Sequence, residues 1–280
     1  MKMATHVLKY SKFGIYHLSC TQKIYETYFN KLNIPSNGSL SVMDIGCGSG
    51  SILFDILHPL LPKNCNEIIA TDIDECMIKY CEKINKEKNI SFLQMDIATN
   101  ELPEALENRF DAIFSSFCFM YVTNIRRGLM NCRRMLKTNS DILLVFISKK
   151  NPLYSTYAEM NRCEIWKPYT ENFKDFVPHF SSDDPDSEVN SLFEDVNLQL
   201  VNKEFHHNLR FESNRRNFLE VFNSMDTVFR KIPVEKRALY LTHFQKFFSD
   251  VSGLNVADQG SLDQPASMNI PIAILHGRKL

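Results

Sequence analysis

The 280-residue sequence lacks a strong net charge and lacks a long apolar run. Its formal net charge is −1, which gives no electrostatic footprint for nucleic acid. The longest apolar run, Ile142 to Ile147, is far shorter than the roughly 20 residues that a membrane-spanning helix needs. Residues 1–6 lead into polar sequence with no apolar core, so we expect neither a secretory signal nor a membrane span.

The cysteines lack any C-x-x-C spacing. All eight are scattered, and none follows position 163; they are Cys20, Cys47, Cys65, Cys76, Cys81, Cys118, Cys132 and Cys163. Scattered cysteines are typical of reduced thiols and not of a disulfide framework or a zinc site. We therefore expect a cytoplasmic protein without a metal centre. The sequence also lacks internal repeats and low-complexity tracts.

Glycine is scarce, with nine in the chain, yet three occur at alternate positions within residues 42–50, which read Val-Met-Asp-Ile-Gly-Cys-Gly-Ser-Gly. Here a short apolar strand ends at Asp44 and opens into Gly46, Cys47, Gly48 and Gly50. Glycine brings bare backbone against a ligand and tolerates positive φ. A helix capped by a serine is expected next, and the N–H groups at its start would face the ligand.

Strands and helices alternate through the first half of the chain. Strands are expected at residues 40–45, 67–71, 90–95, 110–115 and 141–148, and helices at 19–33, 51–58, 74–88 and around 129–136. This alternation predicts an α/β fold: a Rossmann-like, seven-stranded, mostly parallel sheet with helices on both faces. Strand six is expected at 198–211, and an antiparallel final strand within 269–275.

The character of the chain changes after residue 148. Residues 151–180 are rich in aromatic side chains, and an acidic loop follows at 181–188. Two amphipathic helices are expected at about 213–225 and 234–250. We interpret residues 1–280 as one domain with four parts: an N-terminal helical segment (1–39), a nucleotide-binding core (40–150), an α-helical cap that includes strand six (151–268), and a final strand (269–280).

Acidic residues end each of the first three strands: Asp44, Asp72 and Asp96. In an open α/β sheet, ligands bind at this carboxyl edge. Asp72 lies 24 residues beyond Gly48, where a carboxylate can bond both ribose hydroxyls. Ile73 could pack on an adenine face, and Asp96 with Ile97 could meet the adenine amino group.

In the dinucleotide fingerprint G-x-G-x-x-G the third glycine would fall at position 51. This chain has Ser51 at that position, and its third glycine, Gly50, comes one residue earlier. The observed G-x-G-x-G after an acidic residue resembles motif I of class I S-adenosylmethionine (SAM) methyltransferases. Residues 110–116, Phe-Asp-Ala-Ile-Phe-Ser-Ser, resemble that family's fourth-strand motif, which includes Ser115. The resemblance covers residues 40–150 and implies SAM as the cofactor.

A closer resemblance, to insect juvenile hormone acid methyltransferases, covers nearly the whole chain. It is carried by residues 44–51, 151–154, 176–179 and 183–189. It implies O-methylation of the carboxylate of a lipophilic small acid, such as farnesoic or juvenile hormone acid. In that family a glutamine and a tryptophan hold the substrate carboxylate. Gln22 corresponds to the glutamine; the tryptophan position is Tyr121, and its usual histidine neighbour is Met120.

A carboxylate is already a nucleophile at neutral pH, so the reaction requires no general base, and we name no catalytic residue. The protein has to align the reactants and exclude water. Gln22 and Tyr121 would orient the acid, and Phe117 and Trp166 are candidates for an apolar pocket, as are Phe119, Met120 and Tyr154. For each aromatic side chain taken alone, core packing is favoured over a contact with the ligand.

Two alternatives remain open. A nicotinamide-dependent oxidoreductase is disfavoured by the early third glycine and by the lack of a Tyr-x-x-x-Lys pair. A methyltransferase-fold protein that binds a partner without turnover is compatible with the sequence, because carboxyl methylation leaves no catalytic pair to identify.

Overall fold

The computed structural model describes residues 5–13, 17–148, 152–171, 183–256 and 261–280. It divides the chain into two compact units. The first, called the core unit, comprises Leu18–Phe146, Ser182–Phe205 and Ala273–Leu280. The second, called the helical unit, comprises Met1–His17, Ile147–Ser181 and His206–Ile272. In this division residues 1–17 group with the segment predicted as a cap, and residues 182–205 group with the core. The predicted organisation of one domain in four parts stays a prediction.

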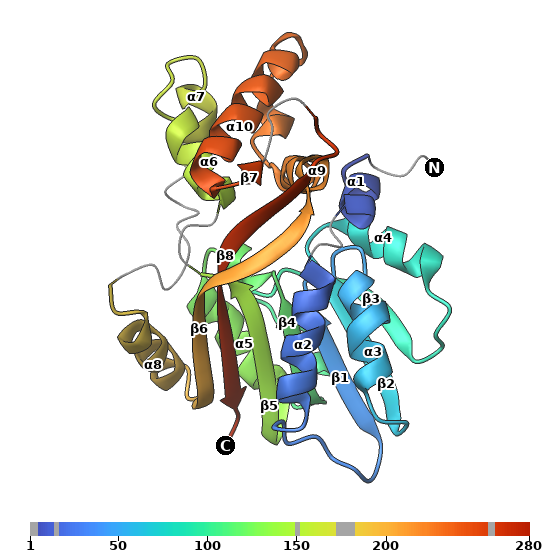
Figure 1. The fold of residues 1–280 in the computed structure, drawn as a ribbon. Helices are drawn as coiled ribbons and strands as arrows, with labels where there is room; N and C mark the ends of the chain where they lie inside the picture. Colours follow the sequence, from blue (N-terminus) through green and yellow to red (C-terminus); the bar gives the residue numbers. More distant parts are fainter. Residues whose placement is uncertain (1–4, 14–16, 149–151, 172–182, 257–260) are drawn as a thin grey trace. The chain divides into compact units, whose positions relative to one another are not determined.

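The chain forms a mostly parallel sheet in the strand order β3-β2-β1-β4-β5-β8-β6 (Figure 1), and the strands β1 to β4 lie wholly within the core unit. The pairs β1·β2, β1·β4, β2·β3 and β4·β5 are all parallel. Backbone hydrogen bonds join Asn139 to Lys279 and Ser148 to Pro271, so β8 runs antiparallel to β5. The strands are β1 (Leu40–Ile45), β2 (Cys65–Asp72), β3 (Ile90–Gln94), β4 (Phe110–Ser116), β5 (Leu136–Ile147), β6 (Gln199–Asn214) and β8 (Pro265–Arg278).

Helices cover both faces of this sheet. On one face, α2 (Leu18–Phe29) places the Tyr25 ring 5.5 Å from the Phe114 ring of β4. On the other face, α8 (Pro185–Asp195) packs Phe193 against Gly277 and Ile142. The remaining helical segments are a π-helical turn (Leu53–Leu57) that continues into α3 (His58–Leu60), then α4 (Glu75–Ile84) and α5 (Ile125–Met135).

The helical unit is built from α1 (Thr5–Phe13), α6 (Pro152–Met160), α7 (Lys167–Thr170), α9 (Arg215–Met225) and α10 (Arg237–Ser252). Within it, α1 packs on α9 and α6 packs on α10. Buried Asp226, at the end of α9, accepts hydrogen bonds from the hydroxyls of Tyr157 and Tyr240, each at 2.7 Å. A short strand, β7 (Asn255–Val256), pairs antiparallel with β8.

The predicted fold class is confirmed, and the predicted elements all exist, with shifted ends. The final strand is longer than expected because Ala266, Met268, Ile270 and Ile272 are buried at alternate positions, as a half-buried strand requires. The sequence also leads us to expect that residues 151–180 cover the carboxyl edge of the sheet. Residues 149–151 and 172–182 lie outside the described residues, so this expectation stays a prediction. None of the helices in the described parts of the chain combines the length and apolar character needed to cross a membrane.

Candidate functional site

The glycine loop lies at the carboxyl end of β1, an inner strand of the sheet between β2 and β4. The backbone N–H groups of Gly46 and Cys47 both donate to Thr71 O, at 2.7 and 2.9 Å, which ties the loop to the end of β2. The φ angles of Gly46, Gly48 and Gly50 are +74°, +55° and +79°. All three glycines therefore occupy the left-handed region that other residues avoid.

Close approach adds a second requirement for glycine at the two outer positions. A Cβ on Gly46 would collide with the Cβ and Sγ of Cys118, and one on Gly50 would come within 2.6 Å of the Phe54 ring. The thiol of Cys81 on α4 donates to Gly48 O at 3.3 Å. Contacts with β2, with Cys118 and with α4 therefore fix the loop, and its glycines present backbone without side chains at the sheet edge.

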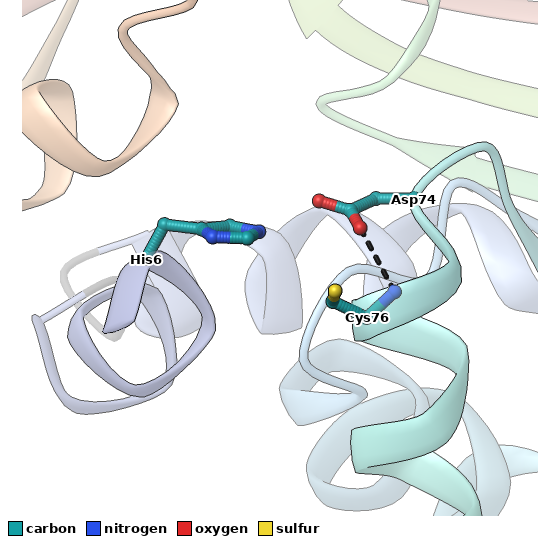
Figure 2. Close-up of side chains that lie close together, drawn as sticks. All are labelled: His6, Asp74 and Cys76. Carbon is teal, nitrogen blue, oxygen red and sulfur yellow. Dashed lines mark hydrogen bonds between the residues drawn. The ribbon is translucent and has the colours of Figure 1, made fainter. Parts of the chain in front are cut away.

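Asp72 connects this loop to α4. Its Oδ2 accepts from Gly48 N at 2.9 Å, and its Oδ1 accepts from Asp74 N at 2.8 Å. Asp74 in turn caps α4, because its carboxylate accepts from Cys76 N at 2.9 Å (Figure 2). Burial raises the pKa of Asp72, while the two backbone N–H bonds counteract that rise.

Asp44 lies beside Asp72 on the same face of the sheet. In the β1·β2 register Asp44 pairs with Ala70, and Asp72 is two residues further along β2, so the two carboxylates project to one side. Only 3% of the Asp44 surface is exposed. Burial and the nearby charge of Asp72 raise the pKa of Asp44 to about 7. Its carboxylate accepts no hydrogen bond from any residue that the structure describes.

Two hydroxyl groups next to Asp44 were not among the predicted site residues. Asp44 also pairs with Phe114, so Ser116, two residues beyond, shares its face. The hydroxyls of Ser116 and the fully buried Tyr25 are 2.9 Å apart. Burial and the charge of Asp44 both raise the pKa of Tyr25. These residues are 91 positions apart. The sequence signal in this region, the four-residue spacing of Ile24, Tyr28 and Leu32, predicts an amphipathic helix but does not include Tyr25.

The structure places the other predicted cofactor residues at the same edge. Ile73 is 66% exposed, an unusual state for a large aliphatic side chain and a suitable one for covering a flat ring. Asp96 is exposed, and its carboxylate accepts from Ala98 N at 2.8 Å. Ile97 is buried beside Gly128 of α5. Ser115 donates to Ile45 O at 2.8 Å and so fastens β4 to β1.

The predicted acceptor residues lie in different surroundings. Gln22 is on the exposed side of α2 and donates to Glu26 at 2.9 Å. Phe117 follows β4 with a φ of +56°, a conformation rare for a bulky residue, and Tyr121 ends the turn after it. Trp166 is buried in the helical unit, where its indole donates to His243 at 2.8 Å and packs edge-on against Tyr240. An acceptor-binding role for each stays a prediction.

Comparisons with known proteins indicate the family of this chain. Residues 43–142 match a family model described as a methyltransferase domain. The chain is 28% identical over 224 residues to the juvenile hormone acid O-methyltransferase of Drosophila melanogaster, covering 79% of this chain and 75% of that protein. It is 31% identical over 177 residues to the enzyme of the same name from Bombyx mori, covering 63% and 62%.

This chain is a class I SAM-dependent methyltransferase. Solved structures share the methyltransferase fold at low identity. The YcgJ protein of Bacillus subtilis superposes with a TM-score of 0.55 at 18% identity, covering 91% of this methyltransferase and 97% of that chain. A phosphoethanolamine N-methyltransferase of Haemonchus contortus, solved with S-adenosylhomocysteine (SAH), gives 0.53 at 13% identity, covering 99% and 59%.

Proposed function

We propose that this methyltransferase transfers a methyl group to a carboxylate oxygen of a small lipophilic acid. The proposal depends mainly on one observation: the similarity to juvenile hormone acid O-methyltransferases extends over 79% of the chain. It therefore reaches well beyond residues 43–142, which match the methyltransferase family model. Similarity in those outer segments bears on substrate choice, since the SAM-binding core is common to enzymes with many acceptors.

The residues at the sheet edge fit SAM. Glycines at 46 and 50 leave room that a Cβ would fill. In our proposal Asp72 accepts hydrogen bonds from the ribose hydroxyls through its remaining lone pairs. Ile73 covers the adenine ring, and Asp96 with the backbone at Ile97 meets its amino edge. Asp44 faces the methionine portion, while Cys47 and Ser115 shape the loop and strand around it.

SAM supplies an electrophilic methyl group when bound, so the chain's own residues have only to position the acceptor. A carboxylate is ionised at neutral pH and needs no proton removed. In this proposal Gln22 and Tyr121 donate hydrogen bonds to one carboxylate oxygen and leave the other free to attack. Phe117 lines the apolar part of the pocket, and a binding role for Trp166 stays a prediction. The phenol of Tyr121 places its donor differently from an indole, so we expect the preferred acid to differ from that of the relatives.

A panel of acceptors tests this proposal. With radiolabelled SAM, we expect methyl transfer to juvenile hormone acid, farnesoic acid or a straight-chain fatty acid, and none to a catechol or an amine. The product should be an ester that mild alkali hydrolyses. Transfer to the catechol or amine, with none to any acid, would show that the acceptor class is wrong.

Two variants test the named donors. Gln22→Ala and Tyr121→Phe should each raise the KM for the acid, because each loses one hydrogen bond to a charged group, worth about 1.5–3 kcal/mol. Lys23→Ala, which alters the neighbouring exposed position of α2, is the matched control and should leave KM unchanged. If the double variant keeps the wild-type KM, the reaction class stands but these two residues do not bind the acid.

A further inference from the structure

The carboxylates of Asp44 and Asp72 lie close together in a buried part of the core unit, and this affects the protonation of the pair as well as its contacts with the cofactor. The inference rests on the proposed placement of SAM at the sheet edge. Both carboxylates project from neighbouring strands to one face, at the carboxyl ends of β1 and β2. Asp44 is almost entirely buried. The side chains that face it from other elements are Tyr25 and Ser116, and its charge also acts on the thiols of Cys47 and Cys118.

No cationic side chain of the described residues balances this pair. The electrostatic influences on Asp44 and Asp72 come from carboxylates, including Asp74. Those on Cys118 likewise come from Asp72, Asp44 and Asp96. A buried carboxylate without a counter-charge is strongly unfavourable, and it either takes up a proton or binds a cation.

The hydrogen bonds identify which carboxyl group takes the proton. Asp72 accepts two backbone N–H bonds, from Gly48 and Asp74, and these stabilise its ionised form. Asp44 accepts none from the described residues. The other titratable groups that face Asp44 stay neutral near pH 7. Burial raises the pKa of Tyr25 and, to about 12, that of Cys118, while a hydrogen bond with Cys81 and then burial raise the pKa of Cys47.

We propose that Asp44 carries a proton in the cofactor-free protein and releases it to solvent when SAM binds. The exchange conserves charge within the site: the carboxyl O–H bond breaks, the proton passes to the buffer, and the carboxylate faces a cation. SAM brings two cationic groups, its sulfonium and its ammonium, together with an anionic carboxylate, so its single net positive charge replaces that of the released proton. SAH keeps only the ammonium, so the ionised pair favours the methyl donor over the demethylated product, and this preference grows as pH rises.

Isothermal titration calorimetry tests the proposal directly. SAM and SAH are titrated into the full chain at pH 7 in buffers of different ionisation enthalpy, and the slope of observed enthalpy against that quantity counts the protons released. Because the pKa of Asp44 is raised to about 7, we expect about half a proton for SAM and a smaller fraction for SAH. Between pH 6 and pH 8 the Kd for SAM should fall about tenfold, as the ionised fraction rises.

Asp44→Asn removes the titratable carboxyl group, so it should abolish both the proton release on SAM binding and the pH dependence of the Kd for SAM. Asp55→Asn, which alters an exposed carboxylate of the core unit, is the matched control and should retain both. Should Asp44→Asn fail to fold, infrared difference spectroscopy of the wild type applies, since SAM should remove the C=O band of a protonated carboxyl group.

The outcomes separate this inference from the proposed function. SAM binding with no proton release and a constant Kd from pH 6 to 8 would overturn the inference and leave the cofactor site intact. Proton release by Asp44→Asn equal to that of the wild type would also overturn the inference alone. A folded protein that binds no SAM across this pH range would overturn both.

Discussion

At the scale of single residues, Gly46 combines two constraints that can be separated experimentally. Its φ of +74° alone disfavours alanine, and a Cβ would also collide with Cys118. Gly38 has a similar φ of +82° but open space around its missing Cβ. We expect Gly38→Ala to lower the free energy of unfolding by about 1 kcal/mol through backbone strain. Gly46→Ala should lower it by roughly 2–4 kcal/mol, because overpacking adds to that strain.

Urea unfolding of both variants measures this difference, and SAM titration extends it to function. The Gly46 variant should lose SAM affinity, whereas the Gly38 variant should retain it. A second substitution, Cys118→Gly, removes the colliding side chain and should recover part of the stability lost in Gly46→Ala. Equal losses in the two single variants would mean that the contact with Cys118 carries no cost.

Some residues of the candidate site could be predicted from the sequence, and others could not. Asp44, Asp72 and the three glycines could be predicted because short-range patterns encode them: a strand, then an acid, then alternate glycines. The Tyr25–Ser116 pair could not be predicted, because it depends on how α2 lies over β4. Gln22 illustrates the same gap, since its helix is predictable but the side of the helix it occupies depends on which residues the sheet buries.

At the scale of elements, one buried carboxylate fastens the antiparallel strand β8 to β5. Asp141 accepts from His276 at 2.9 Å, from Arg278 at 2.6 and 2.8 Å, and from the backbone of Asn33 at 2.7 Å. Its side chain is fully buried. Asp141→Ala should therefore lower the free energy of unfolding by about 3 kcal/mol, because it leaves buried donors unpaired. Asp263→Ala, which breaks the exposed pair with Arg216, should cause no measurable change.

The pH dependence of this effect has a definite sign. Hydrogen bonds from Arg278 and His276 outweigh burial and lower the pKa of Asp141 from 3.8 to about 2. A lowered folded-state pKa means that Asp141 stabilises the protein above about pH 4 and that this stability is lost as pH falls toward 2, by roughly 2 kcal/mol. The difference in unfolding free energy between wild type and Asp141→Ala should shrink over that window. A difference that is constant from pH 5 to pH 2.5 would contradict this explanation.

The same strand pair marks where element boundaries become unpredictable. The run Thr138-Asn139-Ser140 favours a turn, and the sequence pattern places the start of β5 at 141. In the structure Asn139 does have a φ of +62°, yet the strand begins at Leu136, which pairs with Phe110 before the register shifts to Ala112 and Asp141. The register shift is a bulge, and residues 138–140 stay within the strand because the backbones of Asn139 and Ser140 form hydrogen bonds with the backbone of Lys279 near the C-terminus.

At the scale of the whole molecule, the chain folds into two units that the sequence predicts only in part. The change of character after residue 148 is visible in the aromatic content. The sequence does not show that residues 1–17 group with the helical unit and residues 182–205 with the core unit. The first grouping depends on the packing of α1 on α9, in which Lys9 and Glu220 lie 2.7 Å apart although 211 positions separate them. Local patterns carry no information about pairings at that separation.

Every residue proposed to hold SAM belongs to the core unit, and this localises the effect of the cofactor. At a concentration about a hundredfold above its Kd, SAM should add about 2.7 kcal/mol to the unfolding free energy of that unit. Hydrogen exchange of the β1, β2 and β4 amides that open only with global unfolding should then slow by roughly a hundredfold. NAD at the same concentration is the matched control and should change nothing, because the early third glycine does not suit a dinucleotide. Protection of these strands by NAD and not by SAM would contradict the assignment, since the strands surround the glycine loop directly.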